Sequence, residues 1–272
     1  MSVNVKTFAH LADAAGALSS ERGARFFGGG TLIMRAVNEA DPAIETIIRS
    51  SDPSLLHVAV SSGRVELGAG VTMAGILAER ELAFLHPVAR AVGGPAIREA
   101  ATVGGNLFAP SPYGDFATAL LALDAAVMLA GGFGQRELTV EELLSRRDRG
   151  SALVSGVAFK RPAVDAFRFV KVTRVRPKGI SVLSIAAQLP LASGRVSGAR
   201  IAYGAMGNTP VRAKAAERAL EGRALDAAGI AATLAVAGDG TAPADDAIAS
   251  AWWRREILPV HLRRLLLGAG HA

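Results

Sequence analysis

Three consecutive glycines are the first feature of this sequence that could do chemistry. Gly28, Gly29 and Gly30 follow a short extended run and precede a helical run that Thr31 could cap. Glycine admits positive φ angles and a close approach by a ligand, and successive N–H groups in such a turn attract anions. The pattern is not a Rossmann fingerprint, because Ile33 stands where the third glycine belongs. It predicts a diphosphate-binding loop, with a plain strand-to-helix turn as the alternative.

A second glycine pair lies further along the chain. Thr102 and Asn106 flank Gly104 and Gly105 and could add side-chain hydrogen bonds to a second anion-binding loop. Asp115 follows at the start of an apolar helix, where it could act as a helix cap or accept a hydrogen bond from a ribose or ribityl hydroxyl. Two such loops and a carboxylate suit a dinucleotide better than a single phosphate.

Strands and helices that alternate along the chain must position these loops. The expected strands cover residues 25–27, 55–60, 64–67, 125–129, 153–159, 180–191 and 199–205. The expected helices cover residues 31–38, 72–80, 85–92, 115–123, 211–220, 224–237 and 247–267. Thr139 and Glu142 form a capping box that should open a further short helix. This order predicts an α+β chain, with both glycine loops in a domain of residues 1–165 and an antiparallel sheet plus helices in residues 166–272.

Composition excludes several classes of function. The 272 residues contain no cysteine, so the chain can form no disulfide and hold no thiolate-bound metal or iron–sulfur cluster. The net charge is +6, but with two Trp and two Tyr and no basic tract between aromatic residues, a nucleic-acid partner is not expected. No apolar run reaches the roughly 20 residues of a membrane helix, and the N-terminus has no secretory pattern. A cytoplasmic location without membrane insertion is expected.

The two glycine segments and Asp115, in this order and spacing, resemble the flavoprotein (medium) subunit of the molybdenum hydroxylases. That family includes xanthine dehydrogenase, aldehyde oxidase and aerobic carbon monoxide dehydrogenase. The resemblance spans nearly the whole chain. The first loop departs from the family pattern at two positions, since Gly28 replaces an alanine and Leu32 replaces a polar residue. The change at Leu32 would remove one polar contact to the cofactor.

The resemblance implies that FAD binds between two N-terminal lobes, ahead of a smaller C-terminal α+β domain. The cofactor-binding residues that it implies are Phe27, Gly28, Gly29, Gly30, Thr31, Leu32, Thr102, Gly104, Gly105, Asn106, Asp115, Leu153 and Lys171. Asp115 would hold a ribityl or ribose hydroxyl, Leu153 would give an apolar contact, and Lys171 would lie near the isoalloxazine ring. A competing interpretation makes Lys171 one of several solvated charges in residues 171–176. No catalytic side chain and no metal ligand is expected in this chain.

The function that the resemblance implies is electron transfer by an oxidoreductase subunit. Electrons would come from [2Fe–2S] clusters in a small partner subunit, and molybdopterin would lie in a large partner subunit. FAD in this chain would pass the electrons to an external acceptor, in a dimer of heterotrimers. The alternative is a stand-alone module that binds another anionic nucleotide without redox function. An independent flavin oxidase ranks below both, because the C-terminal half offers few acid–base residues for a substrate pocket.

Arginine and tryptophan side chains gather on the predicted C-terminal helix. The cluster comprises Trp252, Trp253, Arg254, Arg255, Arg263 and Arg264. One interpretation is a solvated face with one tryptophan docking the helix. The other is a surface for a partner subunit, because Trp and Arg are enriched at the centres of protein interfaces.

Overall fold

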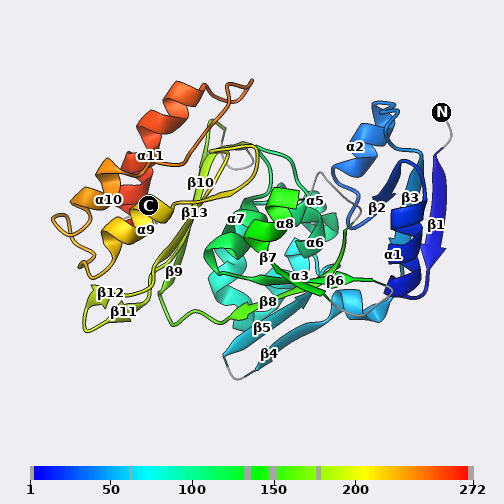
Figure 1. Cartoon of the computed structure of the whole chain (residues 1–272), viewed down its shortest axis with the longest axis horizontal. Coiled ribbons are helices and arrows are strands. Elements are labelled where there is room, and N and C mark those ends of the chain that lie inside the picture. Colours follow the sequence, from blue (N-terminus) through cyan, green and yellow to red (C-terminus); the bar gives the residue numbers. More distant parts are fainter. Residues whose placement is uncertain (1–2, 62, 132–135, 147–151, 176–178, 269–272) are drawn as a thin grey trace. The chain divides into compact units, whose positions relative to one another are not determined.

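The structure is a computed structural model that describes residues 3–61, 63–131, 136–146, 152–175 and 179–268 (Figure 1). The chain divides into two compact units, each made of separate segments of sequence. Unit 1 comprises Met1–Glu81, Gly94–Ala109 and Ala125–Lys160, and unit 2 comprises Leu82–Gly93, Pro110–Asp124 and Arg161–Ala272. None of the helices in the described ranges is long and apolar enough to cross a membrane. A single domain boundary near residue 165 stays a prediction.

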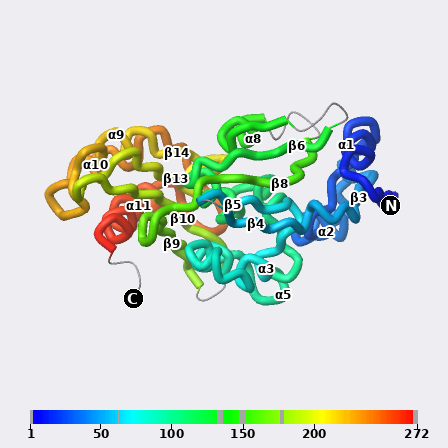
Figure 2. Tube along the Cα trace, turned by 90° about the horizontal axis from the view of Figure 1, so that it is seen from below, coloured from blue at the N-terminus to red at the C-terminus, as the bar shows by residue number. Residues whose placement is uncertain are grey.

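Unit 1 contains a three-stranded parallel sheet near the N-terminus (Figure 1), in the blue part of the tube in Figure 2. Strand β3 (Thr46–Ser50) lies between β1 (Asn4–Phe8) and β2 (Ala24–Phe26). Helix α1 (Leu11–Ser20) buries residues at helical spacing against this sheet, and the short helix α2 (Ile33–Asn38) follows β2. The sheet therefore holds the start of the first glycine segment, which leaves it at the end of β2.

A five-stranded antiparallel sheet forms the rest of unit 1, in the order β4-β5-β8-β6-β7. The strands are β4 (Val58–Ser61), β5 (Arg64–Gly68), β8 (Leu153–Lys160), β6 (Ala126–Ala130) and β7 (Arg136–Thr139). The helices are η1 (Pro53–Leu56), α3 (Met73–Ala78), η2 (Arg80–Leu85, which continues into unit 2), α5 (Pro95–Ala100), α6 (Val103–Leu107) and α8 (Val140–Arg146). The capping box at the start of α8 is confirmed, because Glu142 N–H donates to Thr139 Oγ1 at 3.1 Å and Thr139 N–H to Glu142 Oε2 at 2.8 Å.

Three local expectations for unit 1 are wrong. Helix α2 begins at Ile33 with Leu32 at the cap position, so Thr31 does not cap it. The expected strand over residues 55–60 begins only at Val58, because Asp52 accepts a hydrogen bond from Ser54 N–H and starts a 3-10 turn at Pro53. The second glycine segment, expected as an anion-binding loop, forms helix α6. The two strands expected over residues 55–60 and 64–67 pair with each other as β4 and β5, with Ser61 opposite Arg64, although Ser62 lies outside the described residues.

Unit 2 is built on a four-stranded antiparallel sheet in the order β14-β13-β10-β9. The strands are β9 (Phe167–Thr173), β10 (Ser181–Gln188), β13 (Arg200–Gly204) and β14 (Val211–Arg212), with a small hairpin of β11 (Leu191–Ala192) and β12 (Arg195–Val196). The helices are α4 (His86–Ala91), α7 (Asp115–Ala122), α9 (Lys214–Leu220), α10 (Ala231–Ala235) and α11 (Ala251–Leu266). The predicted α+β class is confirmed.

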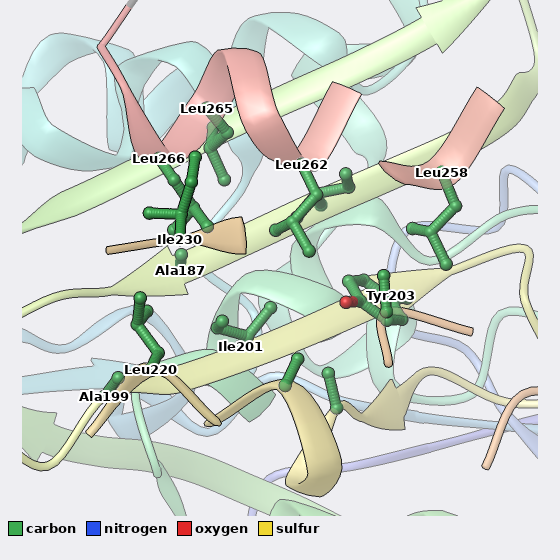
Figure 3. Packing of buried hydrophobic residues seen from close by; sticks show 14 of the residues in the cluster. Ala187, Ala199, Ile201, Tyr203, Leu220, Ile230, Leu258, Leu262, Leu265 and Leu266 are labelled. Atoms are coloured by element: carbon green, nitrogen blue, oxygen red, sulfur yellow. The ribbon is translucent and has the colours of Figure 1, made fainter. Parts of the chain in front are cut away.

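Both faces of the unit 2 sheet are covered. Helix α7 packs on β10 and β13, and the helices of the C-terminal segment pack on the same strands with a hydrophobic cluster (Figure 3). Leu258, Leu262 and Leu265 of α11 recur at helical spacing and belong to the same hydrophobic cluster as Ile201 and Tyr203 of β13. A strand buried on both faces reads as a continuous apolar run, which explains why residues 180–191 carried no polar alternation.

The expected C-terminal helices are shorter than their sequence patterns. Val211 and Arg212 pair with β13 as β14, so the helix expected over residues 211–220 begins at Lys214. The helix expected over residues 224–237 reduces to α10, because Gly229 N–H donates to Asp226 Oδ1 in a turn that passes close to the Ala224 carbonyl. Residues 247–250 precede α11, which begins after Ser250, whose hydroxyl accepts from Trp253 N–H.

Candidate functional site

The first glycine segment leaves the parallel sheet with its backbone donors unused. Phe27 N–H still donates to the Ile48 carbonyl at 2.8 Å, as an extension of β2. Beyond it the chain turns, with Gly30 at φ +74°. Among the described residues, no hydrogen bond is donated by the backbone N–H groups of residues 28–32, which are half-buried. Buried or half-buried N–H groups need acceptors, so this row is suited to an anion.

The two glycine segments meet inside unit 1. A Cβ on Gly28 would lie 2.9 Å from Thr102 Oγ1 and 3.7 Å from Gly105 N. A Cβ on Gly29 would lie 1.6 Å from the Ala100 carbonyl oxygen, closer than any side chain allows. The absence of a Cβ therefore lets the first segment lie directly on the residues around Thr102. The structure brings together two segments that are far apart in the sequence.

The second segment is a capped helical turn and not an anion nest. Thr102 accepts the Gly105 N–H on its Oγ1 at 3.0 Å, and Gly104 N–H donates to the Ala69 carbonyl at 2.8 Å. The Asn106 side-chain amide donates to the Thr102 carbonyl at 3.0 Å. The predicted anion-binding conformation is wrong here, because the N–H groups of this segment already have acceptors in unit 1. The segment supports the first loop, and its own contact with a cofactor stays a prediction.

Asp115 and Lys171 lie together in unit 2. The Lys171 ammonium is 2.8 Å from Asp115 Oδ2 and donates to the Ala91 carbonyl at 2.8 Å. Ser181 donates to Asp115 Oδ1 at 2.6 Å, and Gly114, with φ +94°, is the cap residue of α7. The interpretation of Lys171 as a solvated charge is wrong, since its side chain is 14% exposed. Asp115 is the first residue of α7 and not its cap. Contact of either residue with a cofactor stays a prediction.

We expect Lys171→Met to lower the free energy of unfolding by about 3 kcal/mol, because it leaves the Asp115 carboxylate buried without its cation. The double variant Asp115→Leu, Lys171→Met should recover part of this loss, since the pair is then replaced by apolar groups. Urea unfolding of the four proteins of this cycle measures both effects. Lys160→Met, at an exposed lysine at the end of β8, is the matched control and should change little. A single variant as stable as the wild type would contradict the assignment of a buried ion pair.

The other predicted cofactor residues lie in unit 1. Leu153 is 1% exposed and pairs with Ala130 across β8 and β6, so it is a core residue of the five-stranded sheet. The ring of Phe27 closes over Gly30, where a Cβ would lie 2.5 Å from Phe27 Cζ. The Arg49 guanidinium lies 5.5 Å from the centre of the same ring. Arg49 was not among the residues expected from the sequence, because its place beside Phe27 depends on the parallel pairing of β2 and β3.

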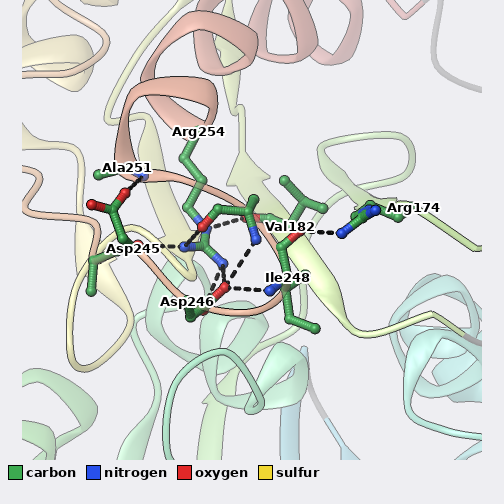
Figure 4. Close-up of polar contacts among 9 residues, drawn as sticks. Arg174, Val182, Asp245, Asp246, Ile248, Ala251 and Arg254 are labelled. Carbon is green, nitrogen blue, oxygen red and sulfur yellow. Dashed lines mark hydrogen bonds and ion pairs between the residues drawn. The ribbon is translucent and has the colours of Figure 1, made fainter.

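The C-terminal arginine cluster divides into a buried and an exposed part. Arg254 is 1% exposed and binds the Asp246 carboxylate and the carbonyls of Val182, Ala244 and Ala249 (Figure 4). Neither tryptophan docks the helix: Trp252 is 64% and Trp253 47% exposed, with ring centres 6.1 Å apart. The interpretation of all four arginines as one solvated face is therefore wrong for Arg254.

Known proteins match both parts of the chain. Residues 2–159 match the family described as "FAD binding domain in molybdopterin dehydrogenase", and residues 168–269 match "CO dehydrogenase flavoprotein C-terminal domain". The nicotinate dehydrogenase FAD-subunit of Eubacterium barkeri is 28% identical over 78% of this chain and 76% of its own length. The carbon monoxide dehydrogenase medium chain of Afipia carboxidovorans is 27% identical over 74% of this chain and 72% of its own.

Solved structures share the fold. A chain of the carbon monoxide dehydrogenase from Hydrogenophaga pseudoflava superposes with a TM-score of 0.90 and 20% identity, covering 100% of this chain and 99% of that one. A chain of reconstituted CO dehydrogenase from Oligotropha carboxidovorans gives a TM-score of 0.87 with 24% identity and the same coverage. At these identities the likeness establishes the fold.

Proposed function

We propose a function for this chain from the premise that it belongs to the molybdenum hydroxylase family, as an FAD-binding subunit of the xanthine dehydrogenase and carbon monoxide dehydrogenase type. The chain is an oxidoreductase subunit whose cofactor is FAD. Its role in our proposal is electron transfer: FAD accepts electrons from [2Fe–2S] clusters of a small partner subunit and passes them to an external acceptor. A large partner subunit holds the molybdopterin, in a cytoplasmic dimer of heterotrimers.

The row of N–H groups in residues 28–32, which have no hydrogen-bond acceptor among the residues that the structure describes, carries the binding part of this proposal. A diphosphate has the negative charge and the oxygen acceptors that these donors need. Gly28 and Gly29 keep the row against the support around Thr102, and Leu32 adds no polar side-chain contact. FAD supplies the redox chemistry when it is bound, while the protein binds the cofactor, orients it and excludes water from it.

The experiment that tests the binding part is a titration of the cofactor-free chain with FAD. We expect noncovalent binding, seen as a change in the flavin absorbance and a quenched flavin fluorescence, and we expect ADP to compete. A chain that leaves the flavin spectrum unchanged at saturating protein would contradict the proposal. A chain that binds ADP but not FAD would favour a nucleotide module without redox function, an alternative that none of the comparisons supports.

The electron-transfer part is tested in the assembled complex. When the chain is co-expressed with the genes beside it, we expect it to co-elute in size-exclusion chromatography with a cluster-containing subunit and a molybdopterin subunit. Its flavin should be bleached anaerobically by substrate only in that assembly. Bleaching by substrate of the isolated flavin-loaded chain would contradict the proposed division of labour and indicate an independent flavin oxidase.

A further inference from the structure

The parallel pairing of β2 with β3 places Arg49 beside the first glycine loop. In the parallel register Phe26 is opposite Ile48, and Phe27 N–H donates to the Ile48 carbonyl. Arg49 follows Ile48 at the exposed end of β3, and its guanidinium lies 5.5 Å from the centre of the Phe27 ring. This distance is within the range of a cation–π contact. The guanidinium is therefore held at the point where the loop with the free N–H groups begins.

The Phe27 ring, which contacts Arg49, also packs against the first glycine loop at Gly30. Gly30 has φ +74°, and a Cβ at that position would lie 2.5 Å and 2.6 Å from two carbon atoms of the Phe27 ring. Only glycine permits this closure at so positive a φ angle. The Phe27 ring thus contacts both the loop backbone at Gly30 and the guanidinium of Arg49. The position of the positive charge is coupled to the conformation of the loop.

The charge of Arg49 is not neutralised within the described residues. Neighbouring arginines have partners: Arg22 lies 3.1 Å from Glu45, and Arg25 donates to the Ala24 carbonyl at 2.9 Å. In the described part of the chain, the Arg49 guanidinium has no carboxylate within 4.0 Å and no hydrogen bond to an acceptor, and its one recorded interaction is the cation–π contact with the Phe27 ring. Its five N–H donors are free to bind an anion, and the planar guanidinium suits two oxygens of one phosphate group.

We infer that Arg49 binds the diphosphate of the cofactor and makes the site selective for a flavin that carries two phosphate groups over one that carries a single phosphate. The inference rests on the proposed binding of FAD at residues 28–32. The backbone N–H row takes one phosphate group, and the guanidinium takes oxygens of the other. A flavin mononucleotide can satisfy the N–H row alone, so it gains less from Arg49 than FAD or ADP does.

The test compares Arg49→Met with the wild type in titrations with FAD, ADP and FMN. We expect FAD and ADP to bind about five- to tenfold more weakly to the variant at low salt, in line with one partly exposed charge-assisted contact, and FMN to change less than about twofold. The difference should shrink at 0.5 M salt, because exposed charges are screened. Arg22→Met removes the same charge from the same unit and should leave all three affinities unchanged. Arg49→Lys keeps the charge without the planar fork and should fall between wild type and Arg49→Met.

The outcomes separate the inference from the function on which it rests. If the wild type binds FAD and Arg49→Met binds it equally well, the inference is wrong and the proposed function stands. If Arg49→Met weakens FAD, ADP and FMN by the same factor, Arg49 only positions the loop and the selectivity is overturned. If the wild type binds no FAD, the proposed function fails, whatever the variant does. Thermal unfolding of each protein checks that the exposed substitutions leave the fold intact.

Discussion

Gly29→Ala is expected to weaken FAD binding on the order of 100-fold, the largest effect of any single methyl group in this site. The added Cβ would lie 1.6 Å from the Ala100 carbonyl oxygen and 2.5 Å from its carbonyl carbon. A backbone carbonyl cannot rotate away, so the loop itself must move off the helix end at Ala100. Forced overpacking of this kind costs about 3 kcal/mol, which corresponds to that factor in affinity if it falls on the bound conformation. Flavin fluorescence quenching measures the dissociation constant.

Two further glycine-to-alanine variants serve as comparisons for the FAD affinity of Gly29→Ala. Gly28→Ala places a Cβ 2.9 Å from Thr102 Oγ1, a side-chain atom that can give way, so its effect should be smaller. Gly16→Ala, in the exposed face of α1, has no neighbour within 4 Å and should stabilise the helix by up to about 1 kcal/mol without changing FAD affinity. FAD affinity of Gly29→Ala equal to that of Gly16→Ala would show that residues 28–32 are not the binding loop.

Elements with a complete local signal could be predicted from the sequence. Thr72, where the helix expected over residues 72–80 starts, caps α3 and accepts the Gly75 N–H at 3.0 Å; such a cap needs only residues within one turn. The same holds for the capping box that opens α8. Strands β8 and β10 could be predicted because most of their residues are buried and the sequence there is largely apolar without a regular polar alternation. In these elements, the local sequence preference and the hydrophobic pattern favour the same structure that the tertiary contacts require.

The rest depends on contacts between distant segments. Residues 103–107 were expected to form an anion-binding loop, but hydrogen bonds from the Val103 and Gly104 N–H groups to the carbonyls of Val71 and Ala69 fix them as a helical turn. Arg49 lies on a strand that was not expected, since β3 is short and lies between two parallel strands. The contact of Lys171 with Asp115 likewise joins β9 to α7. Neither contact leaves a local signal in sequence.

The two glycine segments of the candidate site, which look alike in sequence, differ in the partners of their backbone N–H groups. Within the described part of the chain, the N–H groups of the first glycine segment have no hydrogen-bond acceptor, as the anion-binding interpretation requires. The second segment also contains a glycine pair, but the N–H groups of Gly104 and Gly105 donate to the Ala69 carbonyl and to Thr102 Oγ1. Its glycines therefore allow close packing of the backbone. Glycine pairs thus have two physical uses, access for a ligand and close approach of backbone, and only the hydrogen-bond partners distinguish them.

Arg254→Met is expected to destabilise unit 2 by more than about 3 kcal/mol, because a fully buried guanidinium with an ion pair and several carbonyl acceptors cannot be replaced by an apolar side chain of similar length. The Val182 carbonyl, which accepts from Arg254 Nε at 2.9 Å, would be left buried without that donor. Asp246, which binds Nη2 through both oxygens at 2.9 and 2.8 Å, would lose its cation. The chain has only two tryptophans, and both precede Arg254 on α11, so tryptophan fluorescence follows this unfolding directly.

The neighbouring arginine provides the matched control. Arg255 is exposed on the same helix, and Arg255→Met should unfold at nearly the wild-type midpoint. Arg254→Lys should remain destabilised, because an ammonium cannot replace the planar fork that reaches Asp246 and the carbonyls together. Equal midpoints for Arg254→Met and Arg255→Met would contradict the structural role of the buried guanidinium.

The pH dependence of stability separates the ion pair from the packing of the side chain. Burial alone would raise the pKa of Asp246, but hydrogen bonds from Ala249 and Ile248 N–H and the Arg254 guanidinium hold that pKa below its ordinary value. A carboxyl with a lowered folded pKa stabilises the protein above its unfolded pKa of about 4, and this stabilisation is lost as the pH falls through the folded value. The wild type should therefore lose more stability than Arg254→Met between pH 5 and pH 2, since the variant keeps only the two backbone donors. An equal loss in both proteins would assign the low-pH sensitivity to other carboxylates and leave Arg254 with a packing role alone.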